Sequence, residues 1–514
     1  MRLGRLCQSA VDWFSDVLER RSPIFLALFG LVYLVVTLFR ARMRAMWFDE
    51  FFTYYLSRLP TMAEVWSALA AAADLNPPLS YAIARAGHAV FGRQEAVDRL
   101  PALVGFGLMT LSLFAFVRRR RPAASAAAAM LLPAVTGAYR YAYEARPYGL
   151  LLGFGGLAML CWQRAADGRH RTLALVGLSA SLAAAVSCHY FGVLFFLPLA
   201  VGETLRLASR KRLDWTLYGS VAAGAAPLLL YLPLMRAASA FSAHSWSRPS
   251  FTLVLDFYRG LLSPTSIALA AALCLAAAAE IGLPHPQQPP PASQSPPVHE
   301  WGAALTLALL PFPLLIVSKL VTNLFADRYA IGAVIGIAIL LGFLVAGRRP
   351  AAVLALIFLA AFLVPAARQA PRFRWQVDHS MADDPLLTLA GRSDLPIVFS
   401  DGHAFLHATY YGPPLLRPRM VYLCDTEAAL RLAGFDTLEY GLPALRRWAP
   451  IRAEPYRAFL ARYPEFFLHD SPPNVYEWVV RQLVQDGARL VLLAQEENRR
   501  LYRVSLTPSA RQHP

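Results

Sequence analysis

Two adjacent carboxylates, Asp49 and Glu50, follow the first long apolar segment of this chain, within the aromatic stretch MWFDEFFTYYL. A charged side chain at membrane depth costs roughly 2.5 to 3.5 kcal/mol, so such residues normally face a cavity or a partner. Carboxylates can deprotonate a hydroxyl group or bind a divalent cation. Because adjacent residues point in different directions on a helix, the two side chains are expected to have different roles.

A third acid, Asp74, stands in the sequence DLNPPL, where Asn76 is a potential helix cap before two prolines. We expect Asp74 to approach Asp49 beneath one surface helix, where converging carboxylates could bind a cation or share acid–base work. The alternative is structural: these acids cap helices or pair with Arg58 and Arg99.

The next polar motif is YRYAYEARPYG, which contains Glu144, Arg146 and Tyr148 between two apolar segments. The planar guanidinium of Arg146 is suited to bind a phosphate or pyrophosphate group. Anchoring at the membrane interface by tyrosines and long arginine side chains is the alternative interpretation.

Two further polar pairs lie between apolar segments, His189 with Tyr190 and Asp327 with Arg328. A lone histidine in a loop is more often satisfied structurally than a ligand, and Arg328 could be either an anchor or a phosphate contact. The topology below places all of these motifs on one side of the membrane. Asp49, Asp74 and His189 are the candidate metal ligands.

The composition indicates a polytopic membrane protein, because 57% of the 514 residues are hydrophobic and only 16% are charged. A helix needs about 17 or more apolar residues to cross the hydrocarbon core. About eleven such runs are predicted, at residues 23–39, 100–117, 122–138, 148–163, 172–188, 190–207, 216–235, 263–282, 301–318, 329–346 and 350–367.

Arginine clusters alternate with loops that contain fewer cations, and the positive-inside rule places the clusters and the N-terminus in the cytoplasm. Arg40, Arg42 and Arg44 are exceptions, since they lie on the outer side of the first span. An odd number of spans then places the C-terminal region outside a cytoplasmic (inner) cell membrane.

Two domains are predicted. Residues 1–367 form the membrane domain, with a long external loop at 40–99 and a Pro-rich cytoplasmic linker at 283–300. The external loop is expected to contain two helical stretches, around 62–73 and at 78–91. Residues 368–514 alternate short apolar strands with helical segments, which is typical of a small α/β domain. The expected strands are residues 395–400, 420–424, 466–469 and 490–494. Since this region has no phosphate-binding glycine motif, we expect it to dock or to contact an acceptor.

The net charge of +16 and the five cysteines exclude some functions. The excess of cations lies mainly in the membrane domain, so it indicates topology and contact with anionic lipid, and no nucleic acid is expected as a partner. The cysteines are scattered and lack metal-binding spacing, which argues against a disulfide framework or a zinc site.

Six motifs in order carry a resemblance to a known family: WFDE at 47–50, DLNPPL at 74–79, FGRQEAVDRLPA from 91, YEARPYGLL from 143, SCHYFG from 187 and DRYAI from 327. Over residues 20–367 the chain resembles the GT-C class of polyprenol-dependent glycosyltransferases. The specific similarity is to glycosyltransferase family 39, the protein O-mannosyltransferases and lipid A aminoarabinose transferases. The C-terminal region does not resemble the β-rich domain of the eukaryotic mannosyltransferases.

The resemblance implies that a sugar passes from a polyprenyl-phosphate donor to a lipid, glycan or protein acceptor at the extracytoplasmic face. It makes Asp49, with Glu50 alongside, the catalytic base or metal-associated residue, and Arg146 and Arg328 the residues that hold the lipid phosphate. A divalent metal ion is a candidate cofactor. The other candidate substrate contacts are Asp74, Asn76, Glu144, Tyr148, His189 and Tyr190.

Two other functions stay open. A transporter or flippase for a lipid-linked or anionic substrate should distribute charged residues along its spans, and the predicted spans are almost free of charge. A membrane scaffold that only presents the C-terminal domain predicts that Asp49→Asn and Arg146→Ala leave cellular activity unchanged.

Overall fold

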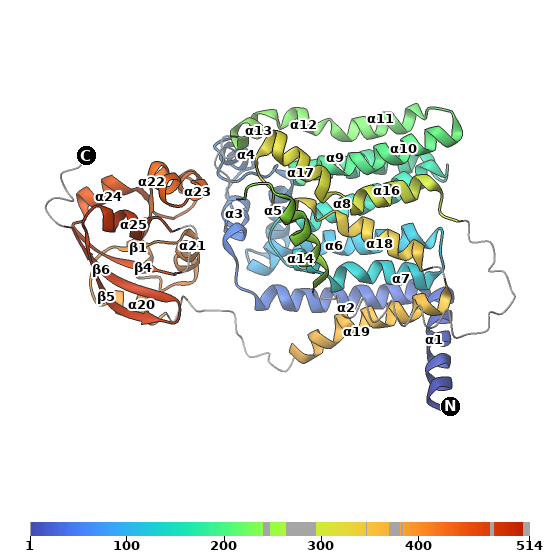
Figure 1. Cartoon of the computed structure of the whole chain (residues 1–514), viewed down its shortest axis with the longest axis horizontal. Coiled ribbons are helices and arrows are strands. Elements are labelled where there is room, and N and C mark those ends of the chain that lie inside the picture. Colours follow the sequence, from blue (N-terminus) through green and yellow to red (C-terminus); the bar gives the residue numbers. More distant parts are fainter. Residues whose placement is uncertain are drawn as a thin grey trace.

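The computed structural model describes residues 2–239, 247–263, 295–345, 347–369, 381, 384–472 and 477–506. An elongated bundle of roughly parallel helices lies beside a smaller α/β domain formed by the C-terminal region (Figure 1). The predicted fold class, a helical membrane protein with a C-terminal α/β domain, is confirmed. Residues 264–282 of the eighth predicted span and residues 283–294 of the Pro-rich linker lie outside the described residues.

The bundle begins with a helix outside the predicted spans, and several of its later helices are short or follow one another after a bend. Its α-helices are α1 (Arg2–Arg20), α2 (Ser22–Met43), α6 (Glu95–Arg118), α7 (Ala123–Leu131), α8 (Tyr148–Ala166), α9 (Arg171–Cys188), α10 (Phe196–Arg210), α11 (Trp215–Ala225), α12 (Pro227–Leu230), α13 (Leu232–Ser239), α14 (Phe251–Leu262), α16 (Val298–Ala308), α17 (Pro311–Val317), α18 (Ala333–Leu344) and α19 (Arg348–Gln369).

Among the described residues, 5 helices are long and apolar enough to cross a membrane, or up to 7 if each bent pair is one span. The bends, of 60° and 58°, separate Trp215–Leu230 from Leu232–Ser239 and Val298–Ala308 from Pro311–Thr322. Proline explains such breaks, because it lacks an N–H group and clashes with the preceding turn. These helices confirm the predicted multi-pass protein, while the number of about eleven spans stays a prediction.

The long loop after α2 folds into three short helices at one end of the bundle: α3 (Phe48–Ser57), α4 (Met62–Ala70) and α5 (Leu79–Phe91). The helices predicted around 62–73 and 78–91 correspond to α4 and α5. Thr61 caps α4, since its hydroxyl accepts the N–H of Glu64 while the Glu64 carboxylate accepts the N–H of Thr61.

Glycines allow α6 and α8 to approach backbone to backbone. A Cβ atom at Gly105 of α6 would collide with the backbone of Gly149, and one at Gly153 of α8 would collide with the backbone of Gly105. Small residues four apart are typical of close helix contacts in membranes. This contact sets the position of both helix ends that face the loop helices.

The C-terminal domain contains one six-stranded sheet in the order β3-β2-β1-β4-β6-β5. Strands β1, β2, β3 and β4 are parallel, and β6 is antiparallel to both β4 and β5. The elements are α20 (Pro385–Ala390), β1 (Ile397–Phe399), α21 (Gly402–Tyr411), β2 (Met420–Cys424), α22 (Thr426–Leu432), α23 (Thr437–Leu445), β3 (Ala453–Pro455), α24 (Tyr456–Arg462), β4 (Glu465–Asp470), α25 (Val479–Gln485), β5 (Arg489–Glu496) and β6 (Arg499–Ser505).

This domain docks on the loop helices through α21. The hydroxyl groups of Tyr410 and Tyr411 donate to the two carboxylate oxygens of Glu95, both at 3.0 Å, and the Met46 N–H donates to Tyr411 at 2.9 Å. The rings of Phe48 and His403 lie 4.4 Å apart. The helix that carries Asp49 and Glu50 is therefore held between the bundle and the α/β domain.

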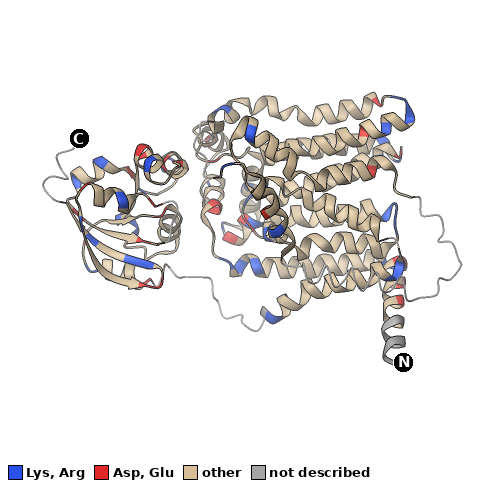
Figure 2. Cartoon of the chain, in the orientation of Figure 1, with Lys and Arg blue, Asp and Glu red and all other residues tan. Residues whose placement is uncertain are grey.

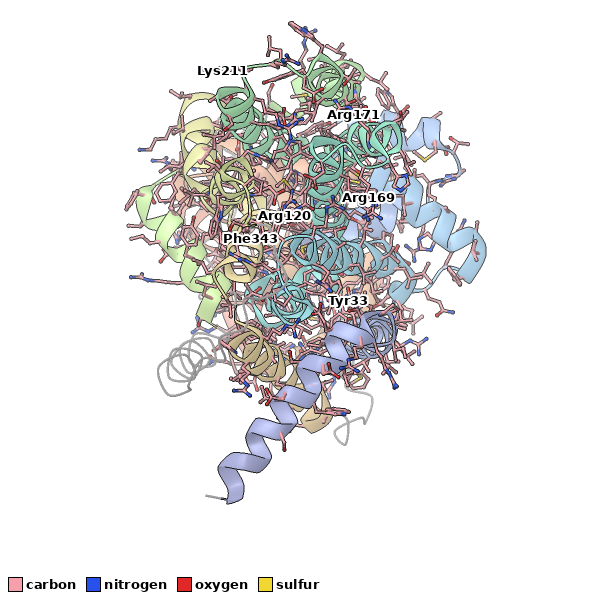
Figure 3. The ribbon with its side chains drawn as sticks, turned by 90° about the vertical axis from the view of Figure 1, so that its right-hand side faces the viewer. Tyr33, Arg120, Arg169, Arg171, Lys211 and Phe343 are labelled. Carbon is pink, nitrogen blue, oxygen red and sulfur yellow. The ribbon has the colours of Figure 1, made fainter. Side chains whose placement is uncertain are left out.

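Charged residues gather at the two ends of the bundle, and the middle of the helices is almost entirely uncharged (Figure 2). Figure 3 looks onto the end opposite the α/β domain, where Arg120, Arg169, Arg171 and Lys211 are labelled. Arg120 is buried there, and its Nε donates to Glu300 at 3.0 Å. The acids and arginines singled out from the sequence lie at the other end.

Candidate active site

Asp49 and Glu50 occupy the first turn of α3 but have opposite environments. Glu50 is fully buried, and the Arg99 Nε and Nη2 atoms donate to its two oxygens at 2.8 and 3.0 Å. The backbone N–H groups of Ala145 and Trp47 also donate to this carboxylate, at 2.7 and 3.1 Å. Glu50 therefore joins α3, α6 and the loop before α8, and its oxygens have no free position for a substrate.

The Asp49 carboxylate is accessible. Its side chain is 17% exposed, and one of its oxygens lies 3.4 Å from the Arg328 Nη2 atom. Its backbone carbonyl accepts a hydrogen bond of 3.0 Å from Arg146. Residues far apart in the sequence thus converge, and Asp49 is an open carboxylate beside two guanidinium groups.

Arg146 is held by Asp74. The two side chains are almost completely buried, and the Arg146 Nη1 and Nη2 atoms lie 2.6 and 3.3 Å from the Asp74 oxygens. Tyr81 also donates to Asp74, at 2.6 Å. Burial alone would raise the pKa of Asp74, but the charge and hydrogen bonds of Arg146 outweigh this effect and hold the pKa below its usual value. Asp74 is thus a charged support for Arg146.

Arg328 and His189 both pack against aromatic rings at one side of the site. The Arg328 guanidinium lies over the rings of Trp47 and Tyr329, at 5.9 and 5.7 Å from their centroids. His189 lies 5.3 Å from the ring of Tyr148. Burial, together with the charges of Arg146 and Arg328, lowers the pKa of His189 to about 3. His189 is therefore neutral, and its Nδ1 accepts the Phe191 N–H at 3.1 Å, which leaves the proton on Nε2.

Glu144 is a buried carboxylate without a close partner. One oxygen makes no hydrogen bond with any residue that the structure describes, and the other lies 3.8 Å from Arg44. Burial and the nearby charge of Glu50, with a smaller contribution from Asp49, raise the pKa of Glu144 to about 7 despite Arg44. It can therefore exchange a proton near neutral pH.

The other predicted contacts surround these residues. Asn76 is buried and donates to Asp74 at 3.2 Å, so it supports the Arg146 pair. Tyr148 is buried, with its ring 5.0 Å from that of Tyr141. Tyr190 is half-buried and packs against the core shared by the loop helices and the α/β domain.

The predicted metal ligands, Asp49, Asp74 and His189, lie around Arg146 but do not form a metal-binding group among the described residues. The described residues contain no group of three or more His, Cys, Asp or Glu side chains arranged to hold a metal ion. Asp74 already binds Arg146 and Tyr81, and the Nδ1 of His189 accepts a backbone N–H. These donors do not fit a divalent cation, so the positive charge of the site comes from arginine.

Several residues of the site were not predicted from the sequence as site residues. Arg44 lies 3.8 Å from both Glu50 and Glu144, and Tyr81 donates to Asp74. The Trp47 Nε1 group is buried without a hydrogen-bond partner among the described residues. The sequence did contain a signal for Arg44, because this arginine is an exception to the positive-inside rule. An arginine on the outer side is expected to have acidic partners such as Glu50 and Glu144.

Comparison with known proteins agrees with the resemblance that the sequence motifs indicate. Residues 75–235 match the family described as dolichyl-phosphate-mannose-protein mannosyltransferase. Two solved structures of ArnT from Cupriavidus metallidurans are similar, the apo state at 14% identity and TM-score 0.57, and the state bound to undecaprenyl phosphate at 15% and 0.55. These alignments cover 94% and 93% of this chain and 98% of each ArnT chain. Among curated protein sequences there is no match. The similarities confirm the resemblance that the motifs indicated.

Proposed function

The chain is a multi-pass membrane protein with the GT-C fold, and we propose that it transfers a sugar from a polyprenyl-phosphate donor to an acceptor at the extracytoplasmic face. The observation that carries this proposal is the accessible Asp49 carboxylate beside Arg328 and Arg146. A base next to fixed cations is what displacement of a phosphate from a sugar requires. The polyprenyl carrier follows from the ArnT structure that binds undecaprenyl phosphate.

In this reaction the acceptor oxygen attacks the anomeric carbon of the sugar, and the bond from that carbon to the phosphate oxygen breaks. The electron pair leaves with the polyprenyl phosphate, and Asp49 takes the acceptor proton. Arg328 and Arg146 stabilise the charge that develops on the departing phosphate. Because Asp74 fixes the Arg146 guanidinium in advance, little reorganisation is needed during the reaction.

The neighbouring residues have supporting roles in this proposal. Glu50 fixes the start of α3, so that Asp49 points toward the arginines. His189 offers its Nε2 proton to a phosphate or sugar oxygen. Glu144, with a pKa of about 7, is near half protonation at neutral pH and can either donate to or accept from a sugar hydroxyl.

An apolar cavity of about 400 Å³ beside the site offers space for the first isoprene units of the carrier. It lies between α4, α5, α9 and the residue that joins α12 to α13. Its lining residues are Met62, Pro78, Leu79, Ala82, Ala183, Ala184, Ser187 and Tyr231.

Transport of a lipid-linked substrate is the second candidate. A transporter needs polar groups along a path across the bilayer, whereas charged residues are almost absent from the middle of the bundle (Figure 2).

The experiment that tests the proposed function supplies purified protein in detergent with a labelled polyprenyl-phosphate sugar and an extract of envelope lipids and glycans. Acceptor-dependent release of free polyprenyl phosphate, without any sealed compartment, is the expected result. Movement across vesicle membranes without release would contradict the proposal.

A further inference from the structure

A second cavity, of about 380 Å³, lies at the end of α2 on the side of the bundle where the active site lies. Its walls come from α2, from the 3-10 segments Gly137–Ala142 and Asp327–Ala330, and from α14. It is lined by Arg40, Thr136, Gly137, Tyr139, Arg140, Tyr141, Tyr143, Phe257, Gly260, Leu261, Asp327 and Ile331. The active-site residues Asp49, Arg146 and Arg328 are not among them.

One wall of this cavity is formed by the closely packed Tyr139. Tyr139 is buried, its hydroxyl lies 2.8 Å from the Thr37 hydroxyl, and its ring packs against the rings of Phe106 and Phe362. The Arg40 guanidinium lies over this ring, 5.1 Å from its centroid. Arg40 is thus positioned by cation–π contact, in a fixed place at the cavity wall.

The lining residues carry an excess of positive charge. Arg140 is paired with Asp327 at 2.7 Å, whereas Arg40 forms no ion pair with any described carboxylate. Its Nε atom is buried and has no hydrogen-bond partner among the described residues. An anion in the cavity would be attracted by the Arg40 guanidinium, whose charge no described carboxylate balances. The other cation of the same helix end, Arg44, has Glu50 and Glu144 beside it.

The position of Arg40 on α2 indicates where the rest of the ligand lies. Val36 and Val32, one and two turns before Arg40 on the same side of the helix, are partly exposed. They belong to a helix that is long and apolar enough to span the membrane. A molecule with its anion at Arg40 can therefore place apolar chains along α2, which is the arrangement of a lipid at the membrane interface.

We infer that this cavity binds the phosphate head group of an anionic membrane lipid, with the Arg40 guanidinium as its main contact. The residues that line this cavity do not include Arg146 or Arg328, the proposed contacts of the carrier phosphate. The inference therefore does not depend on the proposed transfer reaction. It also gives a physical reason for an arginine that breaks the positive-inside pattern.

The test measures lipid retention by native mass spectrometry of the full-length protein in detergent. Phosphatidylglycerol and phosphatidylcholine with the same acyl chains are supplied as an equimolar mixture. Preferential retention of phosphatidylglycerol is expected, and Arg40→Gln should lower it roughly five- to tenfold, the effect of one cation near a lipid phosphate. Arg42→Gln is the matched control, because Arg42 is an exposed cation two residues further along the same helix.

Equal retention of the two lipids, or equal losses in both variants, would overturn the inference. Two further ligands distinguish the source of the phosphate. If millimolar inorganic phosphate displaces the retained lipid completely, the cavity binds free anions only. If Arg40→Gln lowers the retention of polyprenyl phosphate but not of phosphatidylglycerol, the cavity belongs to the carrier, and the inference is again wrong. Unchanged elution and melting temperature of Arg40→Gln establish that the variant is folded.

Discussion

At the scale of single residues, the carboxylates of the site differ in whether a guanidinium group encloses them. Asp74 and Glu50 are closed by guanidinium groups, whereas Asp49 keeps an accessible carboxylate beside Arg328. Truncation of one partner in such buried pairs is expected to cost several kcal/mol, because it leaves an uncompensated buried charge. A loss of activity in Asp74 or Glu50 variants would therefore result first from a destabilised fold and not from the loss of a group that reacts.

The buried carboxyl group of Glu144 predicts a pH-dependent stability. Its pKa rises from 4.5 to about 7 on folding, so the folded protein holds a proton that the unfolded chain has lost in this range. Stability therefore falls as the pH rises through this window, by roughly 3 kcal/mol in all. Glu144→Gln lacks this titration, so its melting temperature relative to the parent should increase between pH 5 and pH 8. A difference that is constant with pH would show that Glu144 keeps its ordinary pKa.

The candidate active-site residues could be found from the sequence because acids and arginines are conspicuous among apolar segments. Which acid pairs with which arginine could not be predicted. Nothing in the adjacency of Asp49 and Glu50 indicates which of them turns toward Arg99, since this depends on where α6 lies. The structural alternative, pairing with Arg99, holds for Glu50. The functional interpretation, an accessible carboxylate, fits Asp49.

At the scale of elements, the site depends on the contact between α6 and α8. Arg99, which holds Glu50, lies in the first turns of α6, and Arg146 directly precedes α8. The two helices approach at Gly105, Gly149 and Gly153. A change in their spacing therefore moves the supports of Asp49 relative to one another.

Gly153→Leu should separate these helices, because any side chain at this position collides with the backbone of α6. Overpacking of this kind costs about 1 to 3 kcal/mol or more. We expect a lower melting temperature in detergent and a lower transfer rate. The matched control is Gly219→Leu in α11, where a Cβ atom would meet nothing within 4 Å. Similar melting temperatures for the two variants would contradict the close contact.

Most elements could be predicted from apolar periodicity and proline positions, including α4, α5 and strands β1, β2, β4 and β5. Strand β3 is only three residues long and ends in Pro455, so it has no period to detect. Strand β6 reads RRLYRVS, and its arginines conceal a strand that lies between β4 and β5. Its place in the sheet is set by partners that are distant in the sequence.

At the scale of the whole molecule, the α/β domain and the loop helices share one hydrophobic core. Phe51 of α3 packs against Tyr410 of α21, with ring centroids 5.4 Å apart. These contacts join residues more than 300 positions apart, which is why the sequence predicts the domain but not where it docks. Docking on α3 makes the domain part of the support for Asp49.

Replacement of both Tyr410 and Tyr411 by Phe should loosen this docking. The change removes two hydrogen bonds to the Glu95 carboxylate and the acceptor of the Met46 N–H. Hydrogen bonds to charged groups contribute about 1.5 to 3 kcal/mol each. Hydrogen exchange of the amides in residues 46–57 should become faster, and transfer slower.

Tyr502→Phe is the control for this variant, because the Tyr502 hydroxyl in β6 makes no hydrogen bond among the described residues. Unchanged exchange in α3 of the double variant would mean that the α/β domain does not restrain the helix. The same exchange experiment on Gly153→Leu would separate an effect of docking from one of the bundle.

The most direct test of the account is the turnover of Asp49→Asn, measured as release of polyprenyl phosphate by purified protein. Asparagine keeps the shape of the side chain but cannot accept a proton, so the rate should fall roughly 10²- to 10⁴-fold while the melting temperature is unchanged. Asp256→Asn, which alters an exposed acid paired with Arg259 on α14, should retain the parental rate. Parental turnover by Asp49→Asn would contradict the assignment of this carboxylate as the base.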